Sequence, residues 1–458
     1  MDDLLIEKTE NVVKRLNRPR KYAGNPILVA ERSWEGQGVL AYGSVLADST
    51  GGTGTPRLRM WYRGWVQTGE AFHSPICLAE SVDGVSWVKP TFGAQDFGPE
   101  VHLPPEKGQP LPPLRGVPGT NIVWTLSHDC FAIDRDPDDP PRRYKLLASA
   151  FDWWQGLTSA WSPDGIRWTL QKQYAVARLG DRCSYWYDPV RKKHVAWSRC
   201  WSLIPLRVIV QVESDDFENW GPPLLAIQPD RYDREDIQLY GGGAFRYESM
   251  YLGYLEMYWV DSRRLDTQLI SSRDGRRWER AGRRETFIDN GYHGEFDAYW
   301  AFPTSNPPIR IGDKLYIHYT GRPDPHAPPR HVPPGMRGSI GLCTLRVDGF
   351  VSVDATGAEG TLTTKPIVFE KGERLTVNAC PMVGQSGYAP MQLRVEVLDE
   401  TGCPVPGYGK DDAIVVSGDR LDHEIRWRTR PSLAELAGRP LRLRFYLFNS
   451  RLYSFRVT

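Results

Sequence analysis

A seven-residue pattern, Ser-x-Asp-(Gly/Phe)-x-x-Trp, occurs four times in this chain and constrains its fold more than any other feature. The four copies occupy residues 81–87, 162–168, 214–220 and 272–278. In each copy the Asp carboxylate can accept hydrogen bonds from the N–H groups of a tight turn, and Gly tolerates the positive φ that such turns require. The Trp would begin the returning strand as a large packing residue. Each copy therefore predicts a β-hairpin.

The spacing of these copies predicts a repeated four-stranded unit. A degenerate fifth copy at residues 345–350 keeps its Asp and lacks the Trp. The five Asp residues are Asp83, Asp164, Asp216, Asp274 and Asp348. Their separations of roughly 50 to 80 residues suit one propeller blade per copy, with loops of different lengths between the strands. Five copies predict a five-bladed β-propeller.

The pattern changes after residue 354. Five runs alternate apolar and polar residues without a further Asp–Trp hairpin, at 360–364, 374–377, 393–397, 424–427 and 441–445. Such alternation is typical of half-buried antiparallel strands in a small sandwich. The sequence therefore predicts an all-β chain with an N-terminal extension (1–24), a five-bladed β-propeller (25–358) and a C-terminal β-sandwich (359–458). We expect the sandwich to carry no catalytic residue.

Composition and charge narrow the choice of partners. With 57 Lys and Arg against 56 Asp and Glu, the formal net charge is +1, which gives no long-range attraction for nucleic acid or an anionic membrane. The seven cysteines never form a Cys-x-x-Cys pair and are expected to be reduced. The first residues lack an apolar signal core, and no long apolar run occurs. We therefore expect a cytoplasmic protein that binds a carbohydrate substrate and neither nucleic acid nor membrane.

Acidic residues near the starts of the predicted inner strands suggest a reaction. The inner strands of a propeller begin at one shared axial cavity, so their first residues converge. Glycoside cleavage needs one carboxylic acid to protonate the leaving oxygen and one carboxylate to attack or to activate water. The catalytic candidates are Asp181, Asp297, Asp236, Glu35 and Glu295. We expect Asp181 and Asp297 to line one pocket; the alternative is that such acids cap turns or pair with arginine.

Residues near the same strand starts are candidates for sugar binding. They are His128, Asp129, Trp154, Tyr185, Trp186, Tyr240, Tyr299 and Trp300. An aromatic ring can pack on sugar C–H groups while polar neighbours bind hydroxyls, although packing between blades is the competing interpretation for each ring. The tryptophans of the repeated hairpins are assigned to packing alone. The histidines lack the spacing of a metal site, so neither a metal nor another cofactor is expected.

These features together resemble a known group of enzymes. The repeated hairpins and the change to a sandwich pattern resemble the glycosidase clan of invertases, levansucrases, arabinanases and arabinofuranosidases, with the mannoside phosphorylases as relatives. Local stretches at 25–28, 180–181, 271–275 and 345–352 resemble glycosyl hydrolase family 32-like N-terminal regions, and the family 43-like proteins belong to the same clan. The resemblance implies a glycoside hydrolase that acts on a small glycoside or a chain end.

Other functions remain open from the sequence. A non-catalytic carbohydrate-binding propeller would need the aromatic residues and no close pair of acids. A phosphorylase would need a basic phosphate pocket, for which Arg182, Arg199 and Arg234 are candidates. A sialidase would need an arginine triad with a Tyr nucleophile, which cannot be assembled here. A protein-interaction propeller would expose an apolar face.

Overall fold

The computed structural model describes most of the chain, and its regular structure is β-strand. The described residues are 3–48, 57–68, 71–92, 119–125, 129–150, 156–177, 179–180, 182–202, 206–326, 338–382 and 390–458. Among them the helical segments are single 3-10 turns, at η1 (Ser33–Glu35), η3 (Pro140–Arg142) and η4 (Ala434–Leu436). Within this described part, no helix has the length and apolar character needed to span a bilayer. The predicted all-β class is confirmed.

The chain forms two compact units. The large unit comprises Pro19–Ile311 and Leu315–Thr344, and the small unit comprises Met1–Arg18, Gly312–Lys314 and Leu345–Thr458. The first residues of the chain thus belong to the same unit as its C-terminal part. The domain limits expected from the sequence, at 24/25 and 358/359, stay predictions.

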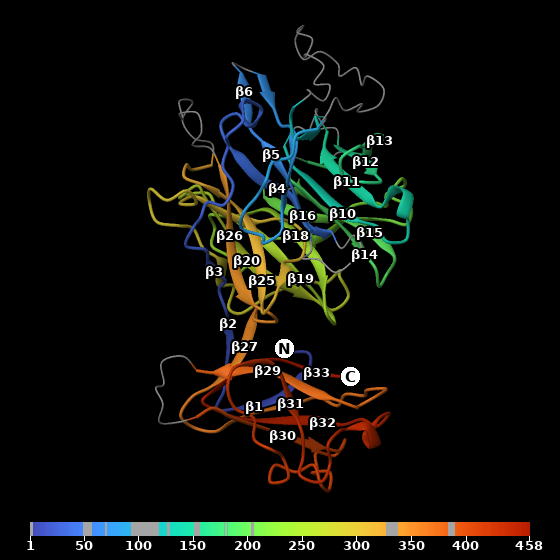
Figure 1. Cartoon of the computed structure of the whole chain (residues 1–458), viewed down its shortest axis with the longest axis vertical. Helices are drawn as coiled ribbons and strands as arrows, with labels where there is room; N and C mark the ends of the chain where they lie inside the picture. Colours follow the sequence, from blue (N-terminus) through green and yellow to red (C-terminus); the bar gives the residue numbers. More distant parts are fainter. Residues whose placement is uncertain are drawn as a thin grey trace. The chain divides into compact units, whose positions relative to one another are not determined.

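The large unit begins with three separate four-stranded antiparallel sheets, in which strand order follows chain order (Figure 1). The first holds β4 (Val39–Asp48), β5 (Arg57–Gly64), β8 (Ile76–Ser81) and β9 (Ile122–Trp124). The second holds β10 (Phe131–Arg135), β11 (Tyr144–Ser149), β12 (Gly156–Ser162) and β13 (Thr169–Ala177). The third holds β14 (Cys183–Asp188), β15 (Lys193–Trp201), β16 (Arg207–Ser214) and β17 (Leu224–Ile227). A two-stranded hairpin, β6 (Val66–Thr68) and β7 (Ala71–His73), follows β5.

Two further strand groups complete the large unit, and a single parallel pair, Leu265 with Trp300, joins them. The fourth group holds β18 (Ile237–Tyr247), β19 (Met250–Trp259), β20 (Arg264–Ser272), β21 (Glu279–Arg280) and β22 (Thr286–Ile288). The fifth group holds β23 (Trp300–Pro303), β24 (Ile309–Ile311), β25 (Lys314–Arg322), β26 (Ser339–Arg346) and the early strand β3 (Arg20–Lys21). Because β3 pairs with β26, residues from the start of the chain supply the last strand of the last group.

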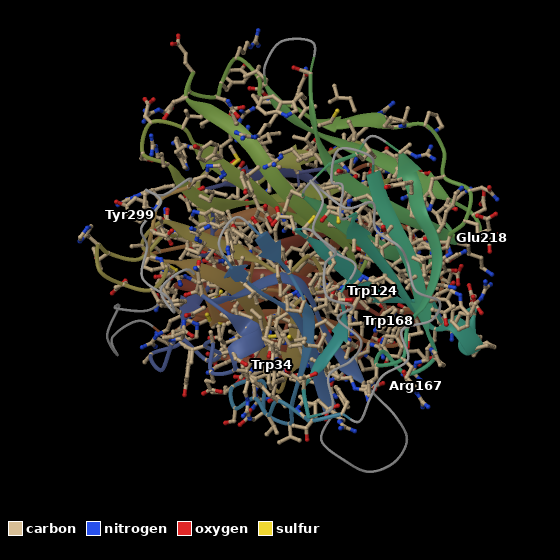
Figure 2. All side chains as sticks on the ribbon, turned by 90° about the horizontal axis from the view of Figure 1, so that it is seen from above. Trp34, Trp124, Arg167, Trp168, Glu218 and Tyr299 are labelled. Carbon is tan, nitrogen blue, oxygen red and sulfur yellow. The ribbon has the colours of Figure 1, made fainter. Side chains whose placement is uncertain are left out.

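The four repeated hairpins form the same turn, as predicted. Each follows the third strand of its group, namely β8, β12, β16 or β20. In the first copy Asp83 Oδ1 accepts the N–H groups of Val85 and Ser86 at 2.8 and 2.7 Å, and Ser81 Oγ accepts that of Gly84 at 2.8 Å. Gly84 has φ 74°, and Phe217 takes the equivalent position in the third copy with φ 65°. The four hairpin tryptophans pack against apolar core residues, as Figure 2 shows for Trp168, which shares a core cluster with Trp124.

The fifth copy differs from the other four. Asp348 has φ 59°, so a tight turn forms, but the following strand β27 (Val351–Ala355) does not return along β26. Instead β27 pairs with β2 (Val13–Leu16) and β33 (Ser450–Val457), which belong to the small unit. The turn therefore leads from the fifth group of strands into the sheets of the small unit.

The small unit contains two antiparallel sheets around one apolar core. One sheet orders β1 (Ile6–Glu10), β28 (Gly360–Thr364), β32 (Arg442–Phe448) and β30 (Gln392–Leu398). The other orders β2, β27, β33, β29 (Leu375–Pro381) and β31 (Arg420–Ile425), so blue N-terminal strands lie among orange and red ones in Figure 1. Both sheets contribute buried side chains to one core cluster, for example Phe445 and Leu452. Strict alternation along β32 places every second side chain in that core.

Candidate functional site

Side chains from all five strand groups of the large unit converge on one set of arginines, acids and aromatic rings. We call this set the central cluster. Its members are Tyr42, Arg63, Trp65, Asp129, Arg182, Arg199, Tyr240, Glu256, Trp300, Phe302, Arg322, Asp324 and His326. Asp129 lies two residues before β10, Arg182 lies directly before β14, and Arg322 ends β25. The cluster therefore gathers residues near the starts of β10 and β14 with one at the end of β25.

A buried ion pair between Arg182 and Glu256 ties the third group to the fourth. Both side chains are 2% exposed, and Arg182 Nε donates to Glu256 Oε2 at 2.9 Å while its Nη2 donates to Oε1. Burial alone would lower the pKa of Arg182, yet this pKa is raised because the Glu256 carboxylate is so close. A Cβ on Gly241 would lie 2.4 Å from Arg182 Cγ and 2.5 Å from Glu256 Oε2. Only glycine at position 241 leaves room for the pair.

Two further arginine–carboxylate pairs share the ring of Trp65. Arg63 pairs with Asp129 and lies 4.8 Å from the Trp65 ring centroid. Arg322 pairs with Asp324 and lies 5.1 Å from the same centroid. Both arginines are buried, whereas the side chains of Asp129 and Asp324 are 20% and 11% exposed. The two acids are therefore the members of these pairs that a ligand can reach.

Arginines also surround a histidine in this cluster. The His326 ring lies 4.7 Å from Tyr258 and 5.3 Å from Tyr240, and it stacks on Trp300 at 5.8 Å. Burial, together with the positive charges of Arg207, Arg199 and Arg322, lowers the pKa of His326 to about 4. The imidazole is consequently neutral at neutral pH and sits in a region of positive potential.

The predicted sugar-binding residues fall into different places. Asp129, Tyr240 and Trp300 belong to the central cluster. Tyr185 is buried and its hydroxyl lies 2.9 Å from His194 Nδ1, while Trp186 packs edge-to-face on Trp197 at 5.7 Å. Tyr299 lies under the guanidinium of Arg264, 5.5 Å from the ring centroid, and Figure 2 shows it toward the periphery of the sheets.

Glu35 and Asp236, two predicted catalytic acids, have nearby structural partners. Glu35 is completely buried, and its carboxylate accepts from Lys89 Nζ at 2.8 Å, from the Tyr62 hydroxyl and from the N–H groups of residues 31 and 32. Asp236 pairs with Arg234 at 3.0 Å, and Arg234 stacks on Trp259. Arg234, proposed above for phosphate, thus lies beside a carboxylate.

Asp297 is buried on the fifth strand group, with Glu295 beside it. Asp297 Oδ2 lies 2.7 Å from Lys21 Nζ and accepts the Tyr319 hydroxyl at 2.8 Å. Asp297 Oδ1 and Glu295 Oε2 lie 2.2 and 2.4 Å from the point that a Cβ of Gly291 would occupy. Burial and the nearby Asp297 carboxylate raise the pKa of Tyr319. Each described partner of the Asp297 carboxylate is a residue of the fifth group.

Three predicted residues, Asp181, His128 and Trp154, lie outside the described residues. The expected Asp181–Asp297 pair therefore stays a prediction. In the sequence, Asp181 directly precedes Arg182 and His128 directly precedes Asp129, both members of the central cluster.

Sequence reasoning missed several members of the cluster. They are Tyr42, Arg63, Trp65, Glu256, Phe302, Arg322, Asp324 and His326. A signal was present for Glu256, because a charged residue inside the apolar strand β19 requires a buried partner. In the part of the chain that the structure describes, no three His, Cys, Asp or Glu side chains gather in a way that could hold a metal ion.

Comparisons with known proteins give a likeness in fold. No protein-family model and no curated protein matches the chain. Among solved structures, one from the GH130 family of mannoside phosphorylases, which contains glycoside hydrolases that target β-1,2 mannosidic linkages in Candida mannan, matches with a TM-score of 0.50 and 13% identity. This match covers 76% of the chain and 96% of the other protein.

Two weaker matches are a glycosyl hydrolase from Bacteroides ovatus and a β-1,2-mannobiose phosphorylase from Listeria innocua. The first has a TM-score of 0.49 and 14% identity, and it covers 72% of this chain and 94% of the other. The second has a TM-score of 0.48 and 15% identity, and it covers 72% and 96%. The match to the GH130 structure shows a shared fold with a relative of the clan named above, while the nearer resemblance to families 32 and 43 stays a prediction.

Proposed function

We propose that the five strand groups of the large unit are the blades of a five-bladed propeller and that the small unit is a β-sandwich. The support is the repeated four-stranded arrangement, the convergence of all five groups on one cluster, and the shared apolar core of the two sheets in the small unit.

We further propose that the protein is a glycoside hydrolase whose substrate binds at the central cluster. The observation that carries this proposal is the pair of reachable acids, Asp129 and Asp324, each held by a buried arginine beside the rings of Trp65 and Trp300. Carboxylates fixed in this way are placed to accept hydrogen bonds from sugar hydroxyls, and the rings offer faces for sugar C–H groups.

The cleavage step needs a carboxylic acid that can donate a proton, and an acid paired with an arginine stays ionised. Asp181 is our candidate, since it stands next to Arg182 in the sequence. Asp297 keeps its place as the second proposed carboxylate, although its contacts with Lys21 and Tyr319 also suit a structural role.

A phosphorylase is the second candidate. Arg199, Arg207 and Arg322 create a positive potential around His326, which is the environment that would hold inorganic phosphate as the attacking group. The matched structure comes from a family of mannoside phosphorylases that contains glycoside hydrolases targeting β-1,2 mannosidic linkages, so we propose β-1,2-linked mannosides as the first substrate class to test.

The test is an end-product assay on β-1,2-mannobiose and a panel of aryl glycosides, with and without inorganic phosphate. Release of free sugar without phosphate supports the hydrolase. A sugar 1-phosphate formed only with phosphate supports the phosphorylase. Sugar binding in calorimetry without turnover of any substrate would contradict both enzyme proposals and favour a binding propeller.

A further inference from the structure

A cavity of about 550 Å³ lies in the large unit, at the ends of β10, β14 and β18. Its lining consists of three arginines, two aspartates, three aromatic residues and four prolines. The volume is within the range that small-molecule sites occupy. No step of the proposed reaction uses this cavity.

The cavity and the central cluster lie at opposite ends of the same strands. Where β10 and β14 begin, the Cys183 N–H donates to Cys130 Sγ at 2.8 Å. Where they end, the Tyr187 N–H donates to Asp134 Oδ2 at 2.9 Å. Four residues of strand separate these contacts, or about 13 Å at the usual rise per residue. The cavity is thus a second place, distinct from the proposed catalytic centre.

The charges of the lining leave one arginine for a ligand. Arg143 lies 2.7 Å and Arg135 lies 4.0 Å from the carboxylate of Asp48. Arg246 instead stacks on Tyr251, 4.8 Å from the ring centroid. Across the described ranges, no carboxylate lies within 4.0 Å of the Arg246 guanidinium. Since an unpaired guanidinium offers a planar fork of donors, Arg246 is suited to an oxyanion.

The other walls of the cavity suit a ring. Trp186, Tyr187 and Phe245 are aromatic, and four prolines complete the apolar surface. Asp134 accepts two backbone N–H groups, from Arg135 and Tyr187, so one carboxylate of the lining already has partners. With three arginines and two aspartates, the lining carries more positive than negative charge.

We propose that this cavity binds a small sugar-like ring that carries an oxyanion, with Arg246 holding the anionic group and Tyr187 and the prolines of the lining contacting the ring. The shared chemistry is a sugar with a carboxylate, phosphate or sulfate substituent. This site is independent of the proposed hydrolase activity.

Titration calorimetry on the full chain at pH 7.5 tests the proposal. The probes are glucuronate, glucose 6-phosphate and glucose 6-sulfate, with neutral glucose and inorganic sulfate as comparisons. We expect at least one anionic sugar to bind at least 10-fold more tightly than both glucose and inorganic sulfate. The three anionic probes distinguish the substituents. Equal binding of glucose would overturn the role of the anion, and equal binding of inorganic sulfate would overturn the role of the ring.

Substitution of Arg246 gives the second arm. Arg246→Gln should weaken binding of the best probe at least 10-fold. The matched control is Arg231→Gln, because Arg231 also stacks on a tyrosine, Tyr232 at 4.8 Å, but lies outside the cavity lining. If Arg246→Gln does not fold, Arg246→Lys keeps the charge without the planar fork and should show intermediate affinity. Unchanged affinity in a folded Arg246 variant, or no binding of any anionic sugar, would refute the proposal.

Discussion

The central cluster and the cavity use arginine in opposite ways. In the central cluster, Arg63, Arg182 and Arg322 are buried, and each faces a carboxylate. At the cavity, by contrast, Arg246 has no carboxylate of the described residues within ion-pair distance of its guanidinium, and it stacks on Tyr251 instead. A buried guanidinium needs its partner to offset desolvation, whereas a partly exposed one can take a partner from solution. The difference separates arginines that hold the strand groups together from one that is available to a ligand.

The largest expected effect is on the buried pair. Glu256→Gln leaves the Arg182 cation buried without its counter-charge, and we expect the free energy of unfolding to fall by about 3–5 kcal/mol. Urea unfolding of the full chain measures the change. Arg246→Gln, made at the cavity, should cost less than about 1 kcal/mol. Similar losses for the two variants would remove the contrast between the central cluster and the cavity.

The chemistry at the strand starts can be tested with a variant that keeps the ion pairs. Asp181→Asn should lower turnover of a substrate found in the end-product assay by about 100-fold or more, because it removes the proposed proton donor. We expect the melting temperature to stay close to that of the parent chain. The exposed residue Asp215 supplies the control, Asp215→Asn. A variant that unfolds without a specific loss of turnover would assign Asp181 to turn capping.

A smaller loss of stability is expected at Gly241, whose backbone lies close to the Arg182–Glu256 pair. Gly241→Ala would place a Cβ 2.4 Å from Arg182 Cγ, so the pair has to shift. We expect a loss of about 1–3 kcal/mol in the free energy of unfolding, the usual range for overpacking. Gly357→Ala is the control, because no atom lies within 4 Å of the added Cβ and its φ is not in the left-handed region. Gly294 has equal space, but its φ of 94° would add backbone strain to an alanine variant. Equal losses in both variants would contradict the tight contact.

The smallest expected effect is a pH dependence at the cavity. Burial raises the pKa of Asp134 to about 6 in the folded protein, above its usual value near 4 when unfolded. The folded state therefore binds this proton more tightly, and the associated stability is present below about pH 4 and is lost as the pH rises through 6. Asp134→Asn should gain stability relative to the parent chain between pH 5 and 7.5, by on the order of 1 kcal/mol because the side chain is partly exposed. Urea unfolding at both pH values measures this gain, and an equal difference at the two values would contradict it.

The hairpin turns could be predicted because their chemistry is local. The hydrogen bonds that the side chains of Ser81 and Asp83 accept in the first turn all come from residues within positions 81–86, so the local sequence contains the contacts that shape the turn. The Gly84 carbonyl also lies 2.9 Å from His318 Nε2, a contact that the local sequence does not contain. The fifth copy marks the limit of this reasoning. Asp348 still forms its turn, but the strand that follows pairs with β2 and β33. The local sequence does not predict which distant strands it pairs with.

The candidate site depends on contacts that are not local. Asp129, Tyr240 and Trp300 were expected to lie together because strand starts converge in a propeller, and all three belong to the central cluster, while their roles stay predictions. Glu35 was predicted as catalytic on equal grounds, yet the fold places Lys89, which lies far from it in the sequence, against its carboxylate. The ionic partner of an acid depends on which strands pair, and those strands can be far apart in the sequence. A single sequence therefore does not show which acids are already in ion pairs.

The amino-acid sequence by itself determined the all-β class and the four repeated turns, because strand alternation and turn contacts involve residues that are close in the chain. It also marked the hairpin tryptophans as packing residues, whereas their contacts, such as Trp168 with Trp124 and Trp278 with Trp197, are tertiary. Only the tertiary structure decided that β3 completes the fifth group and that β1 and β2 join the sheets of the small unit. It also decided that Arg182 meets Glu256, and that Arg246 meets no described carboxylate. These outcomes depend on backbone hydrogen bonds and charges brought together from residues that are often far apart in the chain. Which distant groups become neighbours is settled by packing the whole set of strands at once.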